Sequence, residues 1–374
     1  MSDAEKDRVH MAHALRLAAR GLGSVWPNPA VGCVLVRDGQ IVGRGWTQPG
    51  GRPHAEARAL DEAGPLAKGA TAYVTLEPCA HHGKTPPCAE ALISAGVTRV
   101  VTALTDPDPR VAGRGHAMLR AASLSVTEAV LTEAATRLNA GFLKRVTQNL
   151  PFVTLKLATT LDGRIATASG QSRWITGPAA RRHTHLLRLT HDAVMVGAGT
   201  ARADNPDLSV REMGRTHQPV RIVLDSRLSH RPDSRLGETA RQIPVWMVHG
   251  PAAPPAARSA WAATGAELIE VATSPNGHID PKAALQALAS RGLTRILCEG
   301  GGELAASLIK AGLVDDLAQY QAGALIGADG RAALAPLGLT DLGLAPRLSL
   351  RETRILGTDT YALWSCPSPN TLGG

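Results

Sequence analysis

The sequence HAE at residues 54–56, followed by EPCAHHGKTPPC at residues 77–88, decides how the first half of the chain is interpreted. One histidine and two cysteines give Zn²⁺ three protein ligands and leave the fourth tetrahedral position open, as in catalytic zinc sites. The metal lowers the pKa of a bound water from ~16 to roughly 7, which provides a nucleophile at neutral pH. Glu56 is expected to transfer the proton of that water without binding the metal. The predicted zinc ligands are His54, Cys79 and Cys88.

The spacing of the two cysteines departs from the common pattern. H-x-E followed by P-C-x-x-C is the signature of zinc-dependent nucleobase deaminases. Here eight residues separate Cys79 from Cys88, so a loop is expected between the two thiolates. His81 and His82 lie in this loop, and as further ligands they would close the site and make it structural. Glu56 would have no purpose beside a closed site, and we therefore favour the catalytic interpretation.

Length and composition indicate a two-domain globular protein. A chain of 374 residues exceeds the usual size of one domain, and 44% hydrophobic with 19% charged residues is ordinary for a soluble protein. No run of ~18 apolar residues is present, so we expect no membrane span. The N-terminal sequence MSDAEK is acidic and does not resemble a signal peptide. Five cysteines, two of them assigned to zinc, show no disulfide pattern, so we expect the protein in the reducing cytoplasm.

The net charge of +8 is dispersed along the sequence rather than gathered in one block. Nucleic-acid-binding proteins more often carry a basic stripe with interleaved aromatic residues, and aromatic residues make up only 3% of this chain. Dispersed arginines suit small phosphorylated ligands, because a guanidinium can bind phosphate through two parallel hydrogen bonds. We therefore expect a phosphorylated small molecule as partner, and neither a nucleic acid nor a membrane.

The pattern of apolar segments predicts an α/β domain over residues 1–148. Helices are predicted over residues 5–20, 54–60, 88–95 and 133–144, and strands over residues 31–36, 41–46, 72–76 and 99–104. His54 and Cys88 then both lie at helix N-termini, whose positive ends favour a thiolate over a thiol. The residues Asn149, Leu150 and Pro151 form a natural boundary between domains.

The same alternation of elements continues over residues 149–374, which we assign to a second domain. Strands are predicted over residues 152–157, 193–196, 220–224, 245–248, 267–271 and 295–298. Helices are predicted over residues 178–189 and from the segment 299–303 to Ala311, and a surface loop over residues 250–258.

Three of these strands end in small residues, at positions 197–200, 225–226 and 299–302. In open α/β sheets ligands bind at the carboxyl ends of strands, and a glycine-rich turn into a helix offers N–H groups to a phosphate. The G-x-G-x-x-G fingerprint is absent, and for residues 300–302 alone a simple tight turn is an equal alternative. Three such ends in one domain favour a nucleotide site.

The two halves together resemble the bifunctional deaminase/reductase family of riboflavin biosynthesis, roughly over residues 5–365. In the first half the resemblance rests on PNPAVG at 27–32, HAE at 54–56, TLEPC at 75–79, HHGKTPPC at 81–88 and DPDP at 106–109. In the second half it rests on Lys156, TLDGR at 160–164, SRWIT at 172–176, GT at 199–200, ADNP at 203–206, DS at 225–226 and EGG at 299–301. The long spacing between the cysteines, unusual for deaminases at large, is typical of this family.

The resemblance implies a fold and an activity for each half. The first half would be a cytidine-deaminase-like three-layer α/β/α domain, and the second a dihydrofolate-reductase-like α/β domain. The implied substrate is 2,5-diamino-6-(5-phosphoribosylamino)pyrimidin-4-one. The first domain would replace its 2-amino group by oxygen, and the second would use NADPH to reduce the ribosyl group to a ribityl chain.

The resemblance also implies roles for individual residues. It makes His54, Cys79 and Cys88 the ligands of one Zn²⁺ per chain and Glu56 the proton shuttle. The residues implied to bind NADPH are Ala158, Trp174, Thr200, Asp204, Ser226, Gly301, Gly302, Glu303, Leu304, Ala305, Ala306 and Ser307. The residues implied to bind substrate are Asn28, Ser172, Arg188, Leu208, Arg211 and Glu299, with the two arginines suited to its phosphate.

Plainer interpretations of four of these residues stay open. Asn28 between two prolines is also a common turn residue, Arg188 also fits an exposed helix position, and Trp174 also fits a core. Lys156 is expected on a strand facing the cofactor, where it would orient substrate or pair with an acid; its role is left open.

Two competing functions have to be separated from this one. The first domain could deaminate a flipped base of tRNA, although such an editor has no need of a nicotinamide site. It could also be a structural zinc module that only supports a reductase. The oligomeric state is not determined by the sequence, and a homo-oligomer is compatible with it.

Overall fold

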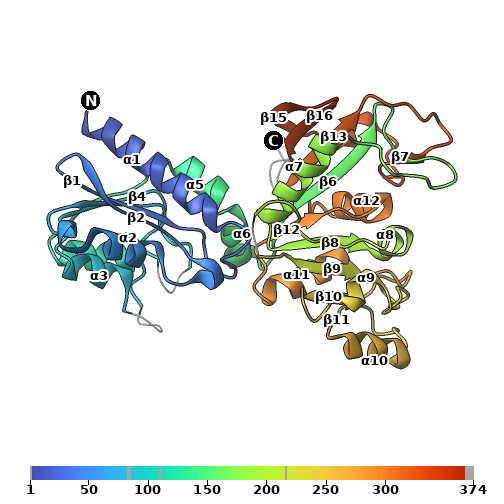
Figure 1. Ribbon diagram of the computed structural model, residues 1–374, viewed down its shortest axis with the longest axis horizontal. Helices are drawn as coiled ribbons and strands as arrows, with labels where there is room; N and C mark the ends of the chain where they lie inside the picture. The colour runs from blue at the N-terminus through green and yellow to red at the C-terminus, as the bar shows by residue number, and fades with distance from the viewer. Residues whose placement is uncertain (1, 82–85, 109–111, 215–216, 367–374) are drawn as a thin grey trace. The chain divides into compact units, whose positions relative to one another are not determined.

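The computed structural model describes residues 2–81, 86–108, 112–214 and 217–366. The chain divides into two compact units, Met1–Leu150 and Pro151–Gly374 (Figure 1). Each unit is built from helices and a mainly parallel or mixed sheet, so the predicted α/β fold class is confirmed. None of the helices in the described residues combines the length and apolarity needed to cross a membrane.

The described residues of the first unit contain a five-stranded mixed sheet of order β2-β1-β3-β4-β5. Strand β1 pairs antiparallel with β2 and β3, whereas β3, β4 and β5 are parallel. The strands are β1 (Gly32–Arg37), β2 (Gln40–Trp46), β3 (Thr71–Val74), β4 (Arg99–Thr102) and β5 (Ser125–Thr127).

Alternate side chains of these strands point to two separate cores, one on each face of the sheet. Cys33, Leu35 and Val74 pack against α2, α3 and α4, whereas Val34 and Tyr73 pack against α1 and α5. Figure 1 shows α1 and α5 on one side of the sheet and α2 and α3 on the other. The three-layer α/β/α arrangement is therefore confirmed. The helices are α1 (Asp3–Ala18), α2 (Ala55–Ala63), α3 (Cys88–Ser94), α4 (Arg114–Ala121), α5 (Thr132–Leu138) and α6 (Ala140–Gln148).

Two glycines of β2 allow α2 to lie unusually close to the sheet. A Cβ atom on Gly45 would lie 2.0 Å from the Ala55 carbonyl oxygen, and one on Gly43 would lie 2.2 Å from the Ala59 oxygen. Both distances are impossible for real atoms, so the approach requires glycine. This packing positions the N-terminus of α2, where His54 lies.

The single helix predicted over residues 133–144 is wrong in one respect, because Asn139 separates α5 from α6. The Asn139 side chain is 2% exposed and binds the backbone of Ala30 twice. Its Nδ2 donates to the Ala30 carbonyl and its Oδ1 accepts from the Ala30 N–H, both at 3.0 Å. A side chain committed to a distant backbone segment favours a break over a continuous helix.

The second unit contains a nine-stranded sheet in the described residues, of order β11-β10-β9-β8-β12-β6-β13-β16-β15. The strands from β11 to β13 are parallel, and β16 and β15 are antiparallel additions at one edge. The central strands are β6 (Phe152–Thr160), β8 (Ala193–Gly197), β9 (Val220–Leu224), β10 (Val245–His249), β11 (Glu267–Glu270) and β12 (Arg295–Cys298). The others are β13 (Asp316–Ala322), β15 (Ser349–Leu356), β16 (Asp359–Ser365) and the separate pair β7 (Arg164–Ala166) with β14 (Arg331–Ala332).

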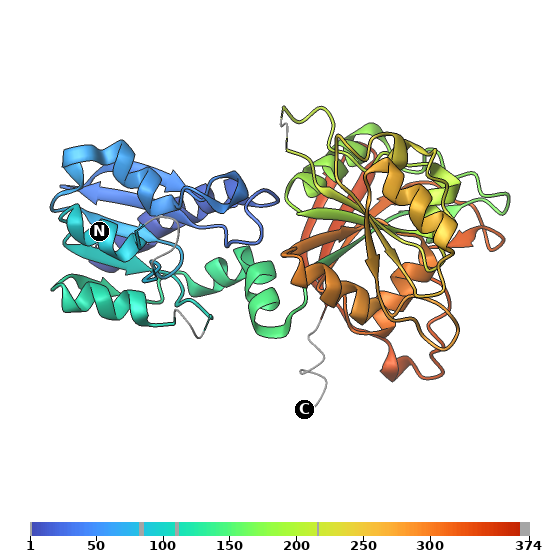
Figure 2. The same ribbon diagram turned by 90° about the horizontal axis from the view of Figure 1, so that it is seen from below.

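Helices cover both faces of this twisted sheet (Figure 2). From β6 to β8, β9, β10 and β11, each connection moves toward the edge strand β11. The connections through α11, to β12, and through α12, to β13, move in the opposite direction. Because crossovers between parallel strands are right-handed, the helices of these two sets of connections lie on opposite faces of the sheet. Trp261 of α10 and Leu236 of α9 are fully buried against β8, β9 and β10. The helices are α7 (Pro178–Leu189), α8 (Ala198–Asp204), α9 (Arg235–Glu238), α10 (Pro255–Thr264), α11 (Pro281–Ser290) and α12 (Gly302–Lys310). Short 3₁₀ turns lie at Ala19–Gly21, Pro49–Gly51, Gly64–Ala67 and Leu342–Leu344.

The second unit differs from the sequence-based predictions in several elements. The strands β7, β13, β14, β15 and β16 and the helices α9 and α11 were not predicted. β15 is exposed along most of its length and lacks the apolar alternation of a half-buried strand. The loop predicted over residues 250–258 is interrupted by α10, which begins at Pro255. Proline is favoured in the first turn of a helix, so the proline-rich composition hid a helix start.

Candidate active sites

A metal-competent group forms where α2 and α3 begin. His54 is the N-cap residue of α2, Cys88 is the first residue of α3, and Cys79 lies in the connection after β3. The His54 Nδ1 atom is 3.3 Å from Cys88 Sγ and 3.8 Å from Cys79 Sγ, and all three ligand atoms lie within 4.8 Å of one another.

These distances suit a tetrahedral zinc ion. Zn–S bonds of ~2.3 Å and Zn–N bonds of ~2.0–2.1 Å place neighbouring ligand atoms roughly 3.5–3.8 Å apart. No fourth histidine, cysteine or acid joins the group within the described part of the chain. His81 is exposed and outside the group, and His82 lies outside the described residues.

The two cysteines are electrostatically unequal. The Cys88 N–H donates to Cys79 Sγ at 3.3 Å. A hydrogen bond from the Cys88 thiol lowers the pKa of Cys79 to about 4, and the same bond together with burial raises the pKa of Cys88. A thiolate at Cys79 is what a metal ligand requires.

Glu56 is buried beside this group, with 4% of its surface exposed. Burial raises the pKa of Glu56 to about 7, and the nearby His54 ring opposes that rise. A carboxyl group with a pKa near the working pH can both accept and donate a proton.

Glu77 has a structural role that the sequence reasoning did not assign, although the residue lies in the TLEPC motif. Its buried carboxylate accepts backbone N–H groups from Asp106, Gly113, Gly115 and His116, at 2.7–3.2 Å. It thereby anchors the loop after β4 to the start of α4. Four donors on one carboxylate stabilise its charged form and the loop together.

Asn28 lies next to the turn that leads into His54. A Cβ atom on Gly51 would lie 1.8 Å from Asn28 Nδ2, and Gly51 has φ +85°. Both facts require glycine at this position. The Asn28 backbone N–H donates to the Val25 carbonyl at 3.0 Å, so the loop that carries Asn28 is itself a turn.

In the second unit, the three strand ends with small residues are brought together. Strands β9, β8 and β12 are neighbours and parallel, so residues 225–226, 197–200 and 299–302 lie side by side at the carboxyl ends of these strands. Thr200 joins two of these ends, because its Oγ1 accepts the Gly301 N–H at 2.9 Å. A Cβ atom on Gly199 would meet no atom within 4 Å, so the backbone there is open to a ligand.

The remaining residues expected at the cofactor differ in exposure. Trp174 is 68% exposed, with the Arg181 guanidinium 4.6 Å from its ring centroid, so it is not a core residue. Ala305 and Ala306 are buried in the core, which leaves the backbone at the start of α12 for a ligand. Ser226 Oγ accepts the Ile279 N–H at 3.2 Å, the Asp204 carbonyl accepts from Arg173 at 2.7 Å, and Ala158 is half-buried on β6.

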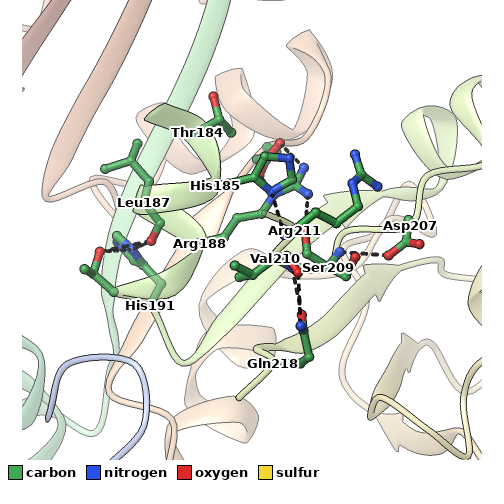
Figure 3. Close-up of polar contacts among 12 residues, drawn as sticks. Thr184, His185, Leu187, Arg188, His191, Asp207, Ser209, Val210, Arg211 and Gln218 are labelled. Atoms are coloured by element: carbon green, nitrogen blue, oxygen red, sulfur yellow. Dashed lines mark hydrogen bonds and ion pairs between the residues drawn. The ribbon is translucent and has the colours of Figure 1, made fainter. Parts of the chain in front are cut away.

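Arg188 is held in a buried ion pair rather than on an exposed helix face. Its Nε and Nη2 donate to the two carboxylate oxygens of Glu299 at 2.6 and 3.0 Å, and its Nη1 donates to the Ser209 carbonyl at 2.8 Å. The two side chains are 12% and 9% exposed. Arg188 holds the pKa of Glu299 at about 2 against the opposing effect of burial. Figure 3 shows Arg188 between α7 and the 207–211 segment.

Arg211 contrasts with Arg188. It is exposed, its guanidinium extends away from Arg188, and it forms no ion pair within the described part of the chain (Figure 3). Leu208, three residues earlier, is buried with φ +61°, an unusual conformation for a leucine. Ser172 is half-buried in the segment before α7.

Lys156 lies on β6 close to the Arg188–Glu299 pair. Burial lowers the pKa of Lys156; Glu299 and Asp204 oppose this effect, and Arg188 adds to it. Its Nζ lies 5.9 Å from the Tyr320 ring centroid. A half-buried ammonium beside a carboxylate and the open strand ends is suited to contact a bound ligand.

Comparisons with known proteins match both units. The model of the cytidine and deoxycytidylate deaminase zinc-binding region matches residues 4–104, and that of the RibD C-terminal domain matches residues 151–362. The riboflavin biosynthesis protein RibD of Escherichia coli is 43% identical over 366 residues, which cover 95% of this chain and 98% of that protein. The RibD protein of Bacillus amyloliquefaciens is 40% identical over 94% of each chain.

Solved structures agree over nearly the whole chain. Acinetobacter baumannii RibD has a TM-score of 0.88 at 37% identity, with 98% of this chain and 100% of that chain covered. A Thermotoga maritima diaminohydroxyphosphoribosylaminopyrimidine deaminase/5-amino-6-(5-phosphoribosylamino)uracil reductase has a TM-score of 0.85 at 32% identity, with the same coverage.

Proposed function

Because the chain belongs to the RibD family of bifunctional riboflavin-biosynthesis enzymes, we propose that its two units act in turn on one phosphorylated pyrimidine. The first unit deaminates 2,5-diamino-6-(5-phosphoribosylamino)pyrimidin-4-one at its 2-amino group. The second reduces the ribosyl group of the product to a ribityl chain with NADPH. Both reactions take place in the cytoplasm.

The main support for the proposed deaminase activity is that His54, Cys79 and Cys88 lie close together beside the buried Glu56. Two thiols and one imidazole are a donor set that zinc prefers, and three ligands leave a position open. Zinc held there would acidify a water molecule for attack on the pyrimidine carbon.

The residues around this group then have distinct tasks. Glu56 accepts the proton of the attacking water on a carboxylate oxygen and passes it to the departing amino group, which leaves as ammonia. Its pKa of about 7 suits both transfers. Asn28, beside the turn that leads to His54, would hydrogen-bond the edge of the pyrimidine.

The proposal for the reductase is based on the carboxyl ends of β8, β9 and β12, which lie side by side in the second sheet. NADPH bound there would supply the reducing equivalents. The open backbone at Gly199 and the start of α12 would accept its phosphates, and Thr200 keeps these two ends together. The other residues that would line NADPH are Ala158, Trp174, Asp204, Ser226 and residues 302–307.

The substrate would bind between these strand ends and the segment 207–211. Arg211 is the available cation for the substrate phosphate, because Arg188 is already paired with Glu299. Arg188 keeps Glu299 and Ser209 in place and offers its remaining N–H groups to the ligand. Ser172, Leu208 and Glu299 complete the proposed substrate contacts.

Two measurements on the purified, zinc-loaded protein test the proposal. Ammonia should be released from the diaminopyrimidine and not from tRNA, and the deaminated product should then support NADPH oxidation. Ammonia from tRNA would indicate an RNA-editing enzyme instead. NADPH oxidation without any release of ammonia would indicate that the first unit is only a structural zinc module.

A further inference from the structure

Helix α7 presents two side chains to the segment 207–211, which carries Arg211. His185 and Arg188 are three residues apart and therefore lie on the same face of the helix (Figure 3). Arg188 donates to the Ser209 carbonyl at 2.8 Å, and the Arg211 backbone N–H donates to His185 Nδ1 at 3.3 Å. Each bond fixes a different residue of the segment.

Side chains, rather than strand pairing, hold this segment in place. Residues 207–211 belong to no strand or helix. The Val210 N–H donates to Gln218 Oε1 at 2.7 Å, and Gln218 Nε2 donates back to the Val210 carbonyl at 3.0 Å. At Arg211 itself, the backbone N–H donates to His185 Nδ1. That bond therefore adds a restraint on the backbone from which the exposed Arg211 guanidinium extends.

We propose that His185 is a positioning residue of the reductase site: its Nδ1 atom holds the Arg211 backbone so that the Arg211 guanidinium can bind the substrate phosphate. This inference rests on the function proposed above, in which Arg211 binds that phosphate. His185 itself acts through Arg211 and does not contact the substrate.

The proposal requires a neutral imidazole. Because the Arg211 N–H is a donor, Nδ1 must be the acceptor, and the ring proton must be on Nε2. A protonated ring carries N–H groups on both nitrogens, so protonation replaces the acceptor with a donor that faces the Arg211 N–H. Protonation of His185 therefore breaks the bond.

The charges around His185 favour the neutral ring. Burial lowers the pKa of His185, and Arg188 on its own helix and Arg211 on the facing segment lower it further. Glu299 after β12 and the Ser209 carbonyl oppose this shift. The ring is consequently neutral at pH 7, and the bond to Arg211 is lost only as the pH falls below the ordinary titration range of histidine.

The direction in which acid changes substrate binding distinguishes a positioning role of His185 from direct contact with the phosphate. If His185 acts through Arg211, acid conditions weaken the binding of the phosphorylated substrate. If the imidazolium touched the phosphate directly, acid conditions would tighten that binding, because a positive charge would appear beside an anion.

The test compares the full-length wild-type protein with His185→Asn and His185→Phe, using the deaminated phosphorylated substrate and its dephosphorylated form. The Asn side chain keeps an acceptor near the position of Nδ1 but does not titrate, whereas Phe removes the acceptor. As the pH falls from about 7.5 through and below the ordinary titration range of histidine, the substrate KM of wild type relative to His185→Asn should rise toward the effect of removing the acceptor. This ratio cancels the titration of the substrate phosphate itself.

At neutral pH His185→Phe should raise the KM for the phosphorylated substrate roughly 2- to 10-fold, the range for loss of one hydrogen bond. The values of kcat, the KM for NADPH and the KM for the dephosphorylated substrate should not change. An equal KM ratio over the whole pH range, a ratio that falls in acid, or an equal effect on the dephosphorylated substrate would overturn the proposal. Should His185→Phe fail to fold, the pH comparison with His185→Asn decides alone.

Failure of the proposed function would be recognised separately. In that case wild-type protein would not oxidise NADPH with the pyrimidine substrate at any pH. Binding of ribose 5-phosphate, measured by calorimetry over the same pH range, would then still test His185. A larger loss of binding in acid for wild type than for His185→Asn supports the positioning role, and an equal loss in both contradicts it.

Discussion

The metal-competent group of the first unit comes from one stretch, His54 to Cys88, whereas the proposed reductase residues come from strand ends and loops spread between Lys156 and Ser307. In the first unit, two helix starts and one short connection are enough to bring the ligands together. In the second, parallel strands must first align three ends, and buried polar contacts must then hold the loops.

This difference has an energetic consequence. Zinc would itself link the three ligands of the first site, and its binding energy adds to the stability of that arrangement. The second site has no such link in the described residues, and contacts such as Arg188–Glu299 hold its parts. Substitutions in the first unit should therefore affect chemistry and metal content, whereas some in the second should affect stability first.

The largest effect is expected from removing a metal ligand. Cys79→Ser or Cys88→Ser should abolish zinc binding, from about one ion per chain, and with it deaminase activity, because two ligands hold zinc poorly. Metal analysis and an ammonia assay check this expectation. Cys33→Ala is the matched control, since Cys33 is buried in the same unit outside the metal group. Full zinc occupancy in both ligand variants would disprove the assignment.

Removal of the proton shuttle should be the next largest effect. Glu56→Ala should retain zinc and lose roughly 10²- to 10⁴-fold in deamination rate, the usual contribution of a general acid–base group. Glu56→Gln, which keeps the shape of the side chain, should lose as much. Both variants should still oxidise NADPH with the deaminated substrate. If that reduction is lost as well, the two sites share residues and do not act independently.

Breaking the buried ion pair should destabilise the second unit. Arg188→Ala leaves the Glu299 carboxylate buried without its cation, which costs about 3–5 kcal/mol. Hydrogen exchange of the β12 amides at increasing urea concentrations would measure the loss in free energy of unfolding. Replacing both partners by methionine should restore much of the stability, because no unpaired charge then remains. A single variant as stable as wild type would show that the pair does not hold the site.

Arg211→Ala provides the contrast within the same site. Arg211 is exposed, so the free energy of unfolding should change by only about 0.5 kcal/mol or less. The substrate KM should nevertheless rise roughly 10- to 150-fold, because a charge-assisted hydrogen bond contributes ~1.5–3 kcal/mol. Steady-state kinetics with each ligand varied in turn will show whether the KM for NADPH stays constant. A selective loss of NADPH affinity would assign Arg211 to the cofactor.

A separate effect, which appears only in acid, concerns the stability of the second unit. His191 is buried between the Leu187 carbonyl and Thr154, and burial lowers its pKa to about 4. The unfolded ring titrates near 6.5, so between about pH 6.5 and about pH 4 the unfolded state binds a proton that the folded state does not. Stability should therefore fall by ~1.4 kcal/mol per pH unit in this window, and the loss from this group should stop below it.

Replacement of the titrating ring tests that slope. His191→Gln keeps one donor and one acceptor but has no proton to gain in this range. Its unfolding free energy should be lower than that of wild type at neutral pH and should depend less on pH between about 4 and about 6.5. Equal slopes in the two proteins would exclude His191 as their source.

Much of the first site could be predicted from the sequence, because its geometry depends on local structure. A residue before a helix and a residue at the first position of the next one are both readable from turn residues and apolar periodicity. His54 and Cys88 lie at these positions in the structure. The role of Glu77 was missed, since its four backbone partners lie in a loop whose path depends on tertiary packing.

In the second unit the sequence determined the strand ends and their glycines, but not the strand order that makes them neighbours. Buried parallel strands are recognisable as short apolar runs, whereas β15 is mostly exposed and carries no such signal. Its place depends on pairing with β16, a contact between segments that no local pattern specifies.

By itself, the sequence determined the two-domain α/β class, the three residues that come together in the metal-competent group and the presence of arginines suited to a phosphate. Only the tertiary structure decided that Arg188 is paired with Glu299, that Arg211 is not, and that His185 holds the Arg211 backbone. The physical reason is range: helix starts and strand runs follow from interactions among near neighbours in the chain. Ion pairs and side-chain contacts to distant loops exist only after the sheet has aligned its strands, because until then their partners are not close together.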